Sequence, residues 1–161
     1  MVLPDILKLG LKVVFCGTAV GDESTRVGAY YAGRGNKFWK VLFRIGLTPR
    51  LLDPHEFRTL PEYGIGLTDL VKTRSGSDAS ISSSDFDVAS FHSKIKRLAP
   101  IVVAFNGKRA AQEFLDRPVA FGQQPEKIGQ TLIFVLPSTS GAAARHWDET
   151  PWIELADFVG Q

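Results

Sequence analysis

Short apolar runs punctuate this sequence and predict its strands. Lys12–Cys16 (KVVFC), Ile101–Phe105 (IVVAF) and Thr131–Leu136 (TLIFVL) are almost continuously apolar, as is typical of strands buried on both faces. Tyr63–Thr68 (YGIGLT) predicts a further short strand. Because buried strands that alternate with helices form a parallel sheet covered on both faces, the pattern predicts an α/β fold.

Apolar residues at helical spacing occupy the segments between these runs. In the first such segment Phe38, Leu42 and Ile45 recur at i, i+4 and i+7, so one face of a helix is apolar. Asn, Thr, Gly and Pro mark where the helices begin and end. The predicted helices are Asn36–Gly46, Asp85–Leu98 with Pro100 as its stop, a segment capped by Asn106 that runs to about Leu115, and a closing helix with Thr150 as N-cap and Pro151 at its first position.

Two loops follow predicted strands and are rich in small and polar residues. Residues 17–35 form a long glycine-punctuated loop after the first strand, and residues 137–145 (PSTSGAAAR) follow the last one. Ligands of parallel α/β sheets bind at the carboxyl ends of the strands, so a ligand site is expected between these loops. The segment 74–84 (RSGSDASISSS) predicts a surface loop rather than a domain boundary.

Composition narrows the class of protein. The 161 residues fit one compact domain, and a net charge of +2 permits contact with a polyanion without requiring it. No apolar run approaches the roughly 20 residues of a membrane span, and the N-terminus lacks the features of a signal peptide, so we expect a cytoplasmic protein. The single Cys16, and histidines without metal-ligand spacing, predict neither an internal disulfide nor a metal cluster.

The chemistry-bearing residues of the first loop each allow two interpretations. Gly17–Gly21 (GTAVG) is neither a dinucleotide fingerprint nor a phosphate-binding P-loop, and a plain turn explains it equally well. Asn36 fits a helix N-cap, which spacing alone favours, or an amide that faces the same cavity. The two tyrosines of the loop fit the core or a flat face for a ligand ring. Asp22 and Glu23 are more simply solvated charges than groups that handle a water or a proton.

A basic helix face has the same ambiguity. Lysine and arginine side chains on one side of the first predicted helix are most simply a solvated surface. With arginines of the two loops they could instead form a rim that contacts phosphates. The residues concerned are Lys37, Lys40 and Arg44 on the helix, and Arg26, Arg34 and Arg145 in the loops.

Four stretches, in this order, resemble one family. They are KVVFCGTAVG, YYAGRGNKFWKVLFRIGLTPRLL, GIGLTDLVK and FVLPSTSGAAAR. Together they resemble the mismatch-specific uracil-DNA glycosylases, the Mug/TDG branch of the uracil-DNA glycosylase superfamily. The N-x-F-W element and the order of the stretches are the specific part, and the resemblance runs from about residue 10 to the closing helix.

The resemblance implies a three-layer sandwich, in which a central four-stranded parallel sheet is flanked by helices and a DNA groove crosses the strand ends. The length predicts a single domain over residues 1–161, and a monomer is the default expectation. The partner is DNA, with a damaged nucleotide flipped into a pocket. The glycosidic bond is hydrolysed without a metal or a cofactor.

Ala19 departs from the family pattern. In the family a G-x-N-P-G loop follows the first strand, and its Asn orients the attacking water; here the loop is G-T-A-V-G, with Ala19 at the Asn position. Some glycosylases of the superfamily lack this Asn, and the Asn of N-x-F-W is their candidate. Asn36 is therefore the first catalytic candidate here, followed by Asp22 and Ser140.

The same comparison assigns a base pocket and DNA contacts. Tyr31 takes the place of the family's stacking aromatic. The wedge that fills the gap left by a flipped base is Gly141-Ala142-Ala143, where the family usually has bulkier side chains. The implied base pocket is Gly17, Thr18, Ala19, Ser24, Tyr31 and Ser138, and the implied DNA contacts are Gly141, Ala142, Ala143, Arg145 and Lys37.

The resulting hypothesis is a monofunctional DNA glycosylase of base excision repair. Uracil is the first substrate, and hypoxanthine, xanthine or an etheno-base are plausible because Ala19 leaves space. One alternative is a catalytically weak or inactive module that binds damaged DNA. The other is a small-molecule hydrolase of similar fold.

Overall fold

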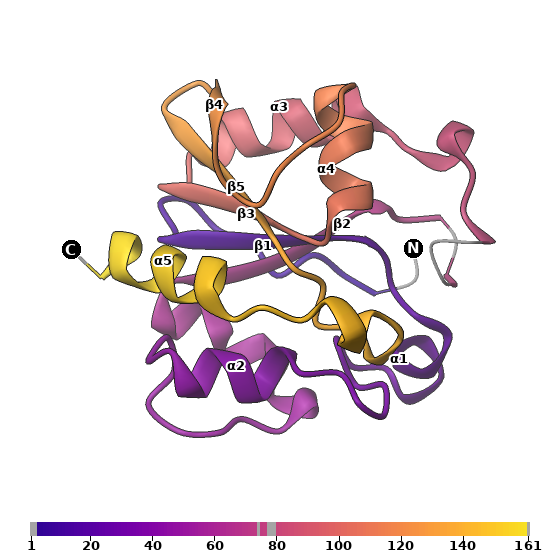
Figure 1. The fold of residues 1–161 in the computed structure, drawn as a ribbon, viewed down its shortest axis with the longest axis vertical. Coiled ribbons are helices and arrows are strands. Elements are labelled where there is room, and N and C mark those ends of the chain that lie inside the picture. The colour runs from indigo at the N-terminus through magenta and orange to yellow at the C-terminus, as the bar shows by residue number, and fades with distance from the viewer. Residues whose placement is uncertain (1–2, 74, 77–79, 161) are drawn as a thin grey trace.

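A computed structural model describes residues 3–73, 75–76 and 80–160 of the chain. Its centre is a five-stranded sheet in the order β2-β1-β3-β5-β4 (Figure 1). The first four strands in this order run parallel to their neighbours, and the fifth pairs antiparallel to β5 at the edge. The strands are β1 (Val13–Ala19), β2 (Ile65–Val71), β3 (Val102–Asn106), β4 (Gly122–Ile128) and β5 (Thr131–Leu136).

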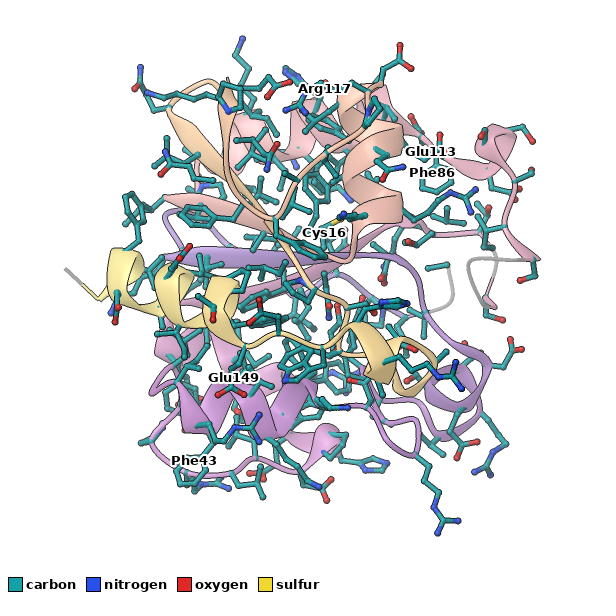
Figure 2. The ribbon with its side chains drawn as sticks, viewed as in Figure 1. Cys16, Phe43, Phe86, Glu113, Arg117 and Glu149 are labelled. Atoms are coloured by element: carbon teal, nitrogen blue, oxygen red, sulfur yellow. The ribbon has the colours of Figure 1, made fainter. Side chains whose placement is uncertain are left out.

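Helices cover both faces of this sheet. Figure 1 shows α2 (Phe38–Arg44) and α5 (Thr150–Val159) on one face, and α3 (Val88–Leu98) and α4 (Lys108–Leu115) on the other. Each face buries its own apolar cluster, one around Trp152 and the other around Phe105. On the first face Arg44 of α2 donates a hydrogen bond to Glu149, which directly precedes α5 (Figure 2). The predicted three-layer α/β fold is confirmed.

The expectation of four strands is wrong by one. The missed strand, β4, has the sequence GQQPEKI, which is mostly polar and contains a proline. Proline and polar side chains are typical of edge strands, which need no continuous apolar run. Only Gln124 and Ile128 of this strand are buried, so no hydrophobic signal marked it.

The strands also run further toward the site than predicted. β1 continues to Ala19, and β2 covers Ile65–Val71 instead of Tyr63–Thr68. The expected loop 17–35 therefore begins inside the sheet, and it also contains a short helix, α1 (Asp22–Val27). The predicted surface loop 74–84 lies partly outside the described residues and includes the 3-10 turn Ser83–Asp85.

Of the side chains predicted to cap helices, only some make the capping hydrogen bond. Asn36 accepts a hydrogen bond from the N–H of Phe38 (3.0 Å), so its capping interaction is present, although the helix begins two residues later. Asn106 does not cap α4, because it is the last residue of β3 and its side chain bonds elsewhere. The N–H of Thr150 bonds to Asp148, which supplies the cap predicted for Thr150.

One further helix begins later than expected, and the 3-10 helix before β2 was not predicted. α3 begins at Val88 rather than at residue 85, since Asp87 accepts from the N–H of Ser90. The 3-10 helix η1 (Pro54–Tyr63) precedes β2 and packs Phe57 and Leu60 into the core. Within the described ranges, no helix has the length and apolar character needed to cross a membrane.

Candidate active site

A cleft of about 940 Å³ opens at the carboxyl ends of the parallel strands. This is the edge where α/β sheets bind ligands, because the loops that leave the strands diverge there. Residues at or just beyond the ends of β1, β2, β3 and β5 all contribute to its wall. They are Thr18 and Ala19 from β1, Asp69 from β2, Asn106 from β3 and Ser138 after β5, joined by Tyr31, Asn36 and Ser140 from the loops.

Gly17 determines how closely β1 and β2 side chains approach at this edge. It stands opposite Asp69 in the parallel register. A Cβ atom at Gly17 would lie 2.7 Å from Asp69 Oδ1 and 3.4 Å from the Tyr31 hydroxyl. The first of these distances is shorter than real Cβ contacts, so only glycine leaves both polar groups in place.

Gly17→Ala should therefore displace the Asp69 carboxyl and damage the cleft. Overpacking of this kind costs about 1–3 kcal/mol in stability. We expect a lower melting temperature by calorimetry and at least a ten-fold lower activity of the site. Gly21→Ala is the matched control, because an added Cβ there meets no atom within 4 Å. Equal effects of the two substitutions would contradict this account.

Asp69 is a buried acid whose charge is only partly compensated. It is 4% exposed, and its Oδ2 atom has no hydrogen-bond partner within the described part of the chain. The Lys72 ammonium lies 3.6 Å from that oxygen, which is an ion-pair distance but a poor hydrogen bond. Burial raises the pKa of Asp69 to about 6, and Lys72 opposes this rise.

Lys72 is itself held by a network of half-buried charges. Its ammonium lies 3.1 Å from Asp5, and that carboxylate also accepts from Lys94 (2.6 Å) and from Thr68 (2.7 Å). Lys72 further donates to the hydroxyl of Tyr30 (3.2 Å). Because the Lys72 ammonium lies closer to Asp5 (3.1 Å) than to Asp69 (3.6 Å), it compensates the charge of Asp69 incompletely.

Tyr31 presents an aromatic ring and a second partnerless polar atom. Its ring stacks on Phe38, with centroids 4.0 Å apart and planes 27° from parallel. Its φ of 51° is a left-handed conformation that a tyrosine rarely adopts, and such strain is concentrated at functional sites. Within the described ranges its hydroxyl has no hydrogen-bond partner, and burial raises the pKa of that hydroxyl.

The two polar atoms of the Asn36 side chain differ in their hydrogen bonding. Its Oδ1 atom caps α2 through the N–H of Phe38. The side chain is half-buried and lines the cleft. None of the described residues accepts a hydrogen bond from its Nδ2 atom. The cap interpretation and the functional interpretation of Asn36 are therefore compatible.

The loop after β5 is fixed by hydrogen bonds to two other elements. The Asn106 side chain accepts from the N–H of Thr139 (3.0 Å) and donates to its hydroxyl (2.9 Å). The carbonyl of Thr139 accepts from the N–H of Lys37 at the start of α2 (2.9 Å). The hydroxyls of Ser138 and Ser140 accept backbone N–H groups of the same loop, which leaves their O–H donors available.

The proposed wedge is not an open loop as expected. Gly141–His146 forms the 3-10 helix η4, capped by Ser140. Gly141 lies against the backbone of Arg34 and Gly35, so the two loops of the site are in contact. Ala142 is exposed at the mouth of the cleft, and so is Arg145 beyond it.

Three other candidate residues lie at the edge of the site. Asp22 is exposed at the start of α1 and accepts from Ser75 (3.0 Å). Ser24 is buried, and its hydroxyl accepts from the N–H of Ala32 (3.0 Å), which gives it a structural role. The Lys37 ammonium lies 5.8 Å from the centre of the Trp147 ring.

Sequence reasoning missed Asp69 and Asn106. A charged residue inside the apolar stretch GIGLTDLVK was the available signal for Asp69, since acids are rarely buried without a reason. Asn106 was interpreted only as a helix cap. In the parts of the chain that the structure describes, no cluster of three or more His, Cys, Asp or Glu side chains could hold a metal ion.

Fold and site together define an α/β protein with an open cleft across the carboxyl ends of its parallel strands. Residues 4–156 match the family model of the Uracil DNA glycosylase superfamily. The chain belongs to this superfamily and is a glycosylase-type hydrolase, and enzymes of this family act on DNA.

A solved structure is similar over the whole chain. It is the solution NMR structure of a protein from Methanosarcina acetivorans that is provisionally named a uracil DNA glycosylase. The TM-score is 0.68 at 24% sequence identity, with 99% of this chain and 97% of that chain covered. At this identity the similarity establishes the fold.

Proposed function

We propose that this protein is a monofunctional glycosylase that excises deaminated bases flipped out of DNA, in the manner of the Mug/TDG branch. The observation that carries the proposal is that two side chains of the cleft wall, Asp69 and Tyr31, each have a buried polar atom without a hydrogen-bond partner among the described residues, and that the Tyr31 ring stacks on Phe38. Unsatisfied buried polar atoms are costly, so they indicate a polar ligand. A flat base with a polar edge fits both features. The chain acts as one domain over residues 1–161 and as a monomer.

The edge of a deaminated base matches the groups at the bottom of the cleft. Uracil, hypoxanthine and xanthine all present a lactam, in which a carbonyl oxygen stands next to an N–H. A carboxyl group that keeps its proton offers one donor and one acceptor, which pair with that edge. The neutral form of Asp69 is accessible because burial raises its pKa to about 6. Tyr31 then stacks against the face of the base.

Departure of the base needs donors and an oriented water. Negative charge develops on the leaving base, and the O–H groups of Ser138 and Ser140 are the fixed donors nearest to this role. The sugar left behind is oxocarbenium-like, so the attacking water needs orientation more than deprotonation. Asn36 supplies an amide for this purpose, in place of the amide that Ala19 lacks.

DNA contacts would surround the cleft mouth. Lys37 and Arg145 lie near the loop after β5 and are suited to phosphates. Gly141, Ala142 and Ala143 stand where a wedge would enter the duplex. Their small size predicts weak support of the flipped state, and hence higher activity on single strands or mismatched pairs than on a regular duplex.

Base release from lesion-bearing oligonucleotides tests the proposal. We expect abasic sites from uracil or hypoxanthine substrates, assayed by alkaline cleavage in single strands, matched duplexes and duplexes with guanine opposite the lesion. Xanthine and ethenoadenine substrates complete the set.

Ala19 and the alanine wedge favour one competing function, a damaged-DNA binder with little or no catalysis. Tight lesion-specific binding without any abasic product after long incubation would support it. Absence of any salt-dependent affinity for DNA would contradict both functions and point to a small-molecule hydrolase.

A further inference from the structure

A second hollow lies beside the cleft. Its volume is about 360 Å³, and it shares part of its wall with the cleft, including the loop after β5. Phe121 and Pro137 line this hollow but not the cleft. The described residues that line it are Gly107, Lys108, Phe121, Pro137, Ser138, Ala143 and His146.

Phe121 makes this hollow unusual. The residue directly precedes β4, and 39% of it is exposed next to a polar cleft. The ammonium of Lys108, at the start of α4, stands 4.5 Å from the centre of the ring. The two side chains thus form a cation–aromatic pair at the surface, where the ring is open to a ligand.

The charge of the hollow favours an anionic ligand. Among the described residues that line it, two are basic, Lys108 and His146, and none is acidic. The cleft itself is mixed, since Asp22, Glu23 and Asp69 contribute to it. An aromatic ring next to a cation is the combination with which proteins bind single-stranded nucleic acid, with the base on the ring and the phosphate on the cation.

We propose that Phe121 and Lys108 form a subsite for a nucleotide of the lesion strand that neighbours the flipped one. This inference rests on the proposed function. Ser138 and Ala143 line both hollows, which places the subsite directly beside the base cleft and within reach of a strand that leaves it. The neighbouring base stacks on Phe121, and its phosphate draws the Lys108 ammonium off the ring.

Fluorescence of 2-aminopurine tests this subsite without any requirement for catalysis. The probe base is placed on either side of uracil in a single-stranded oligonucleotide, and the full-length protein is titrated in. We expect stacking to quench the fluorescence in the wild type, on one side of the lesion only. Phe121→Ala should abolish the quenching and weaken binding about ten-fold, in line with the loss of one base–aromatic stack.

Three further variants sharpen the result: a matched control, a conservative replacement of Phe121 and a variant that removes the charge of Lys108. Phe43→Ala removes an equally exposed ring on the outer side of α2, on the opposite face of the sheet from α4 (Figure 2), and should change neither signal. Phe121→Trp should restore binding and quenching. Lys108→Gln should lower the slope of log affinity against log salt by about one.

The outcomes separate this subsite from the glycosylase function. If Phe121→Ala binds and quenches as Phe43→Ala does, the subsite is refuted, whether or not the wild type releases bases. If the wild type releases no base but Phe121→Ala still loses binding and quenching, the subsite stands and the glycosylase proposal fails. Unchanged kcat at saturating DNA, with a raised KM, is expected of Phe121→Ala if both are right.

Discussion

Asp69→Ala should lower kcat/KM for a deaminated base by roughly 10²–10³-fold, the usual loss when one preorganised polar group is removed from an active site. Asp69→Asn should instead keep most of the activity. A carboxamide and a neutral carboxyl group both offer one donor and one acceptor, so both pair with a lactam edge. Asp69 is buried opposite Gly17 and lines the cleft, and its Oδ2 atom has no hydrogen-bond partner among the described residues.

The pH dependence follows from the same group. The pKa of Asp69 is about 6, so its neutral form prevails below pH 6 and is lost as the pH rises through that value. Wild-type kcat/KM should therefore fall about ten-fold per pH unit above pH 6, whereas Asp69→Asn should show no fall in this range. Asp157→Asn, which changes an exposed acid of α5, is the matched control and should behave as the wild type.

Lys72 offers an independent check of this account. Charged and titratable groups near Asp69 are Lys72, Asp5, Tyr30, Tyr31 and Cys16, and Lys72 lowers the pKa of Asp69. Lys72→Met should shift the fall in activity to higher pH, and Lys72→Arg should restore it. The opposite pattern, an inactive Asp69→Asn and a wild type that gains activity through pH 6, would show that Asp69 acts as an ionised base.

The sequence predicted the architecture because apolar runs carry that information directly. β1, β3 and β5 are buried on both faces, and each was recognised from its run of Val, Ile, Leu and Phe. β4 was missed because an edge strand buries little, so polar residues and a proline are tolerated there. The register, by contrast, depends on contacts between strands that are far apart in sequence.

The difference between local sequence motifs and contacts distant in sequence also explains which residues of the candidate site were predicted. Loop residues such as Asn36, Tyr31 and Ser140 were found because the motifs that contain them are local, and the structure brings all three to one cleft. Asp69 was missed because its role arises only where β2 pairs with β1 beside Gly17. Asn106 was assigned to a cap because the hydrogen bonds to Thr139, more than thirty residues away, cannot be seen in the sequence.

Asn36→Ala should lower single-turnover base release by about 10²–10³-fold, because the amide of Asn106, which also lines the cleft, already bonds to Thr139 and does not replace it. The variant also loses the cap of α2, which costs about 1 kcal/mol in stability. Asn36→Ser separates the two effects. A serine hydroxyl still caps a helix, but it is too short to replace the amide. We expect Asn36→Ser to unfold like the wild type and to react like Asn36→Ala.

Asp87→Ala completes the comparison, because it removes the cap of α3, which does not line the cleft. It should lose about as much stability as Asn36→Ala and retain full activity. Chemical denaturation measures the first quantity, and base release at saturating enzyme measures the second. Undiminished release by Asn36→Ala would move the water-holding role to another cleft group. Ser140 would then come first, because it lines the cleft at half burial, whereas Asp22 is exposed and bonded to Ser75.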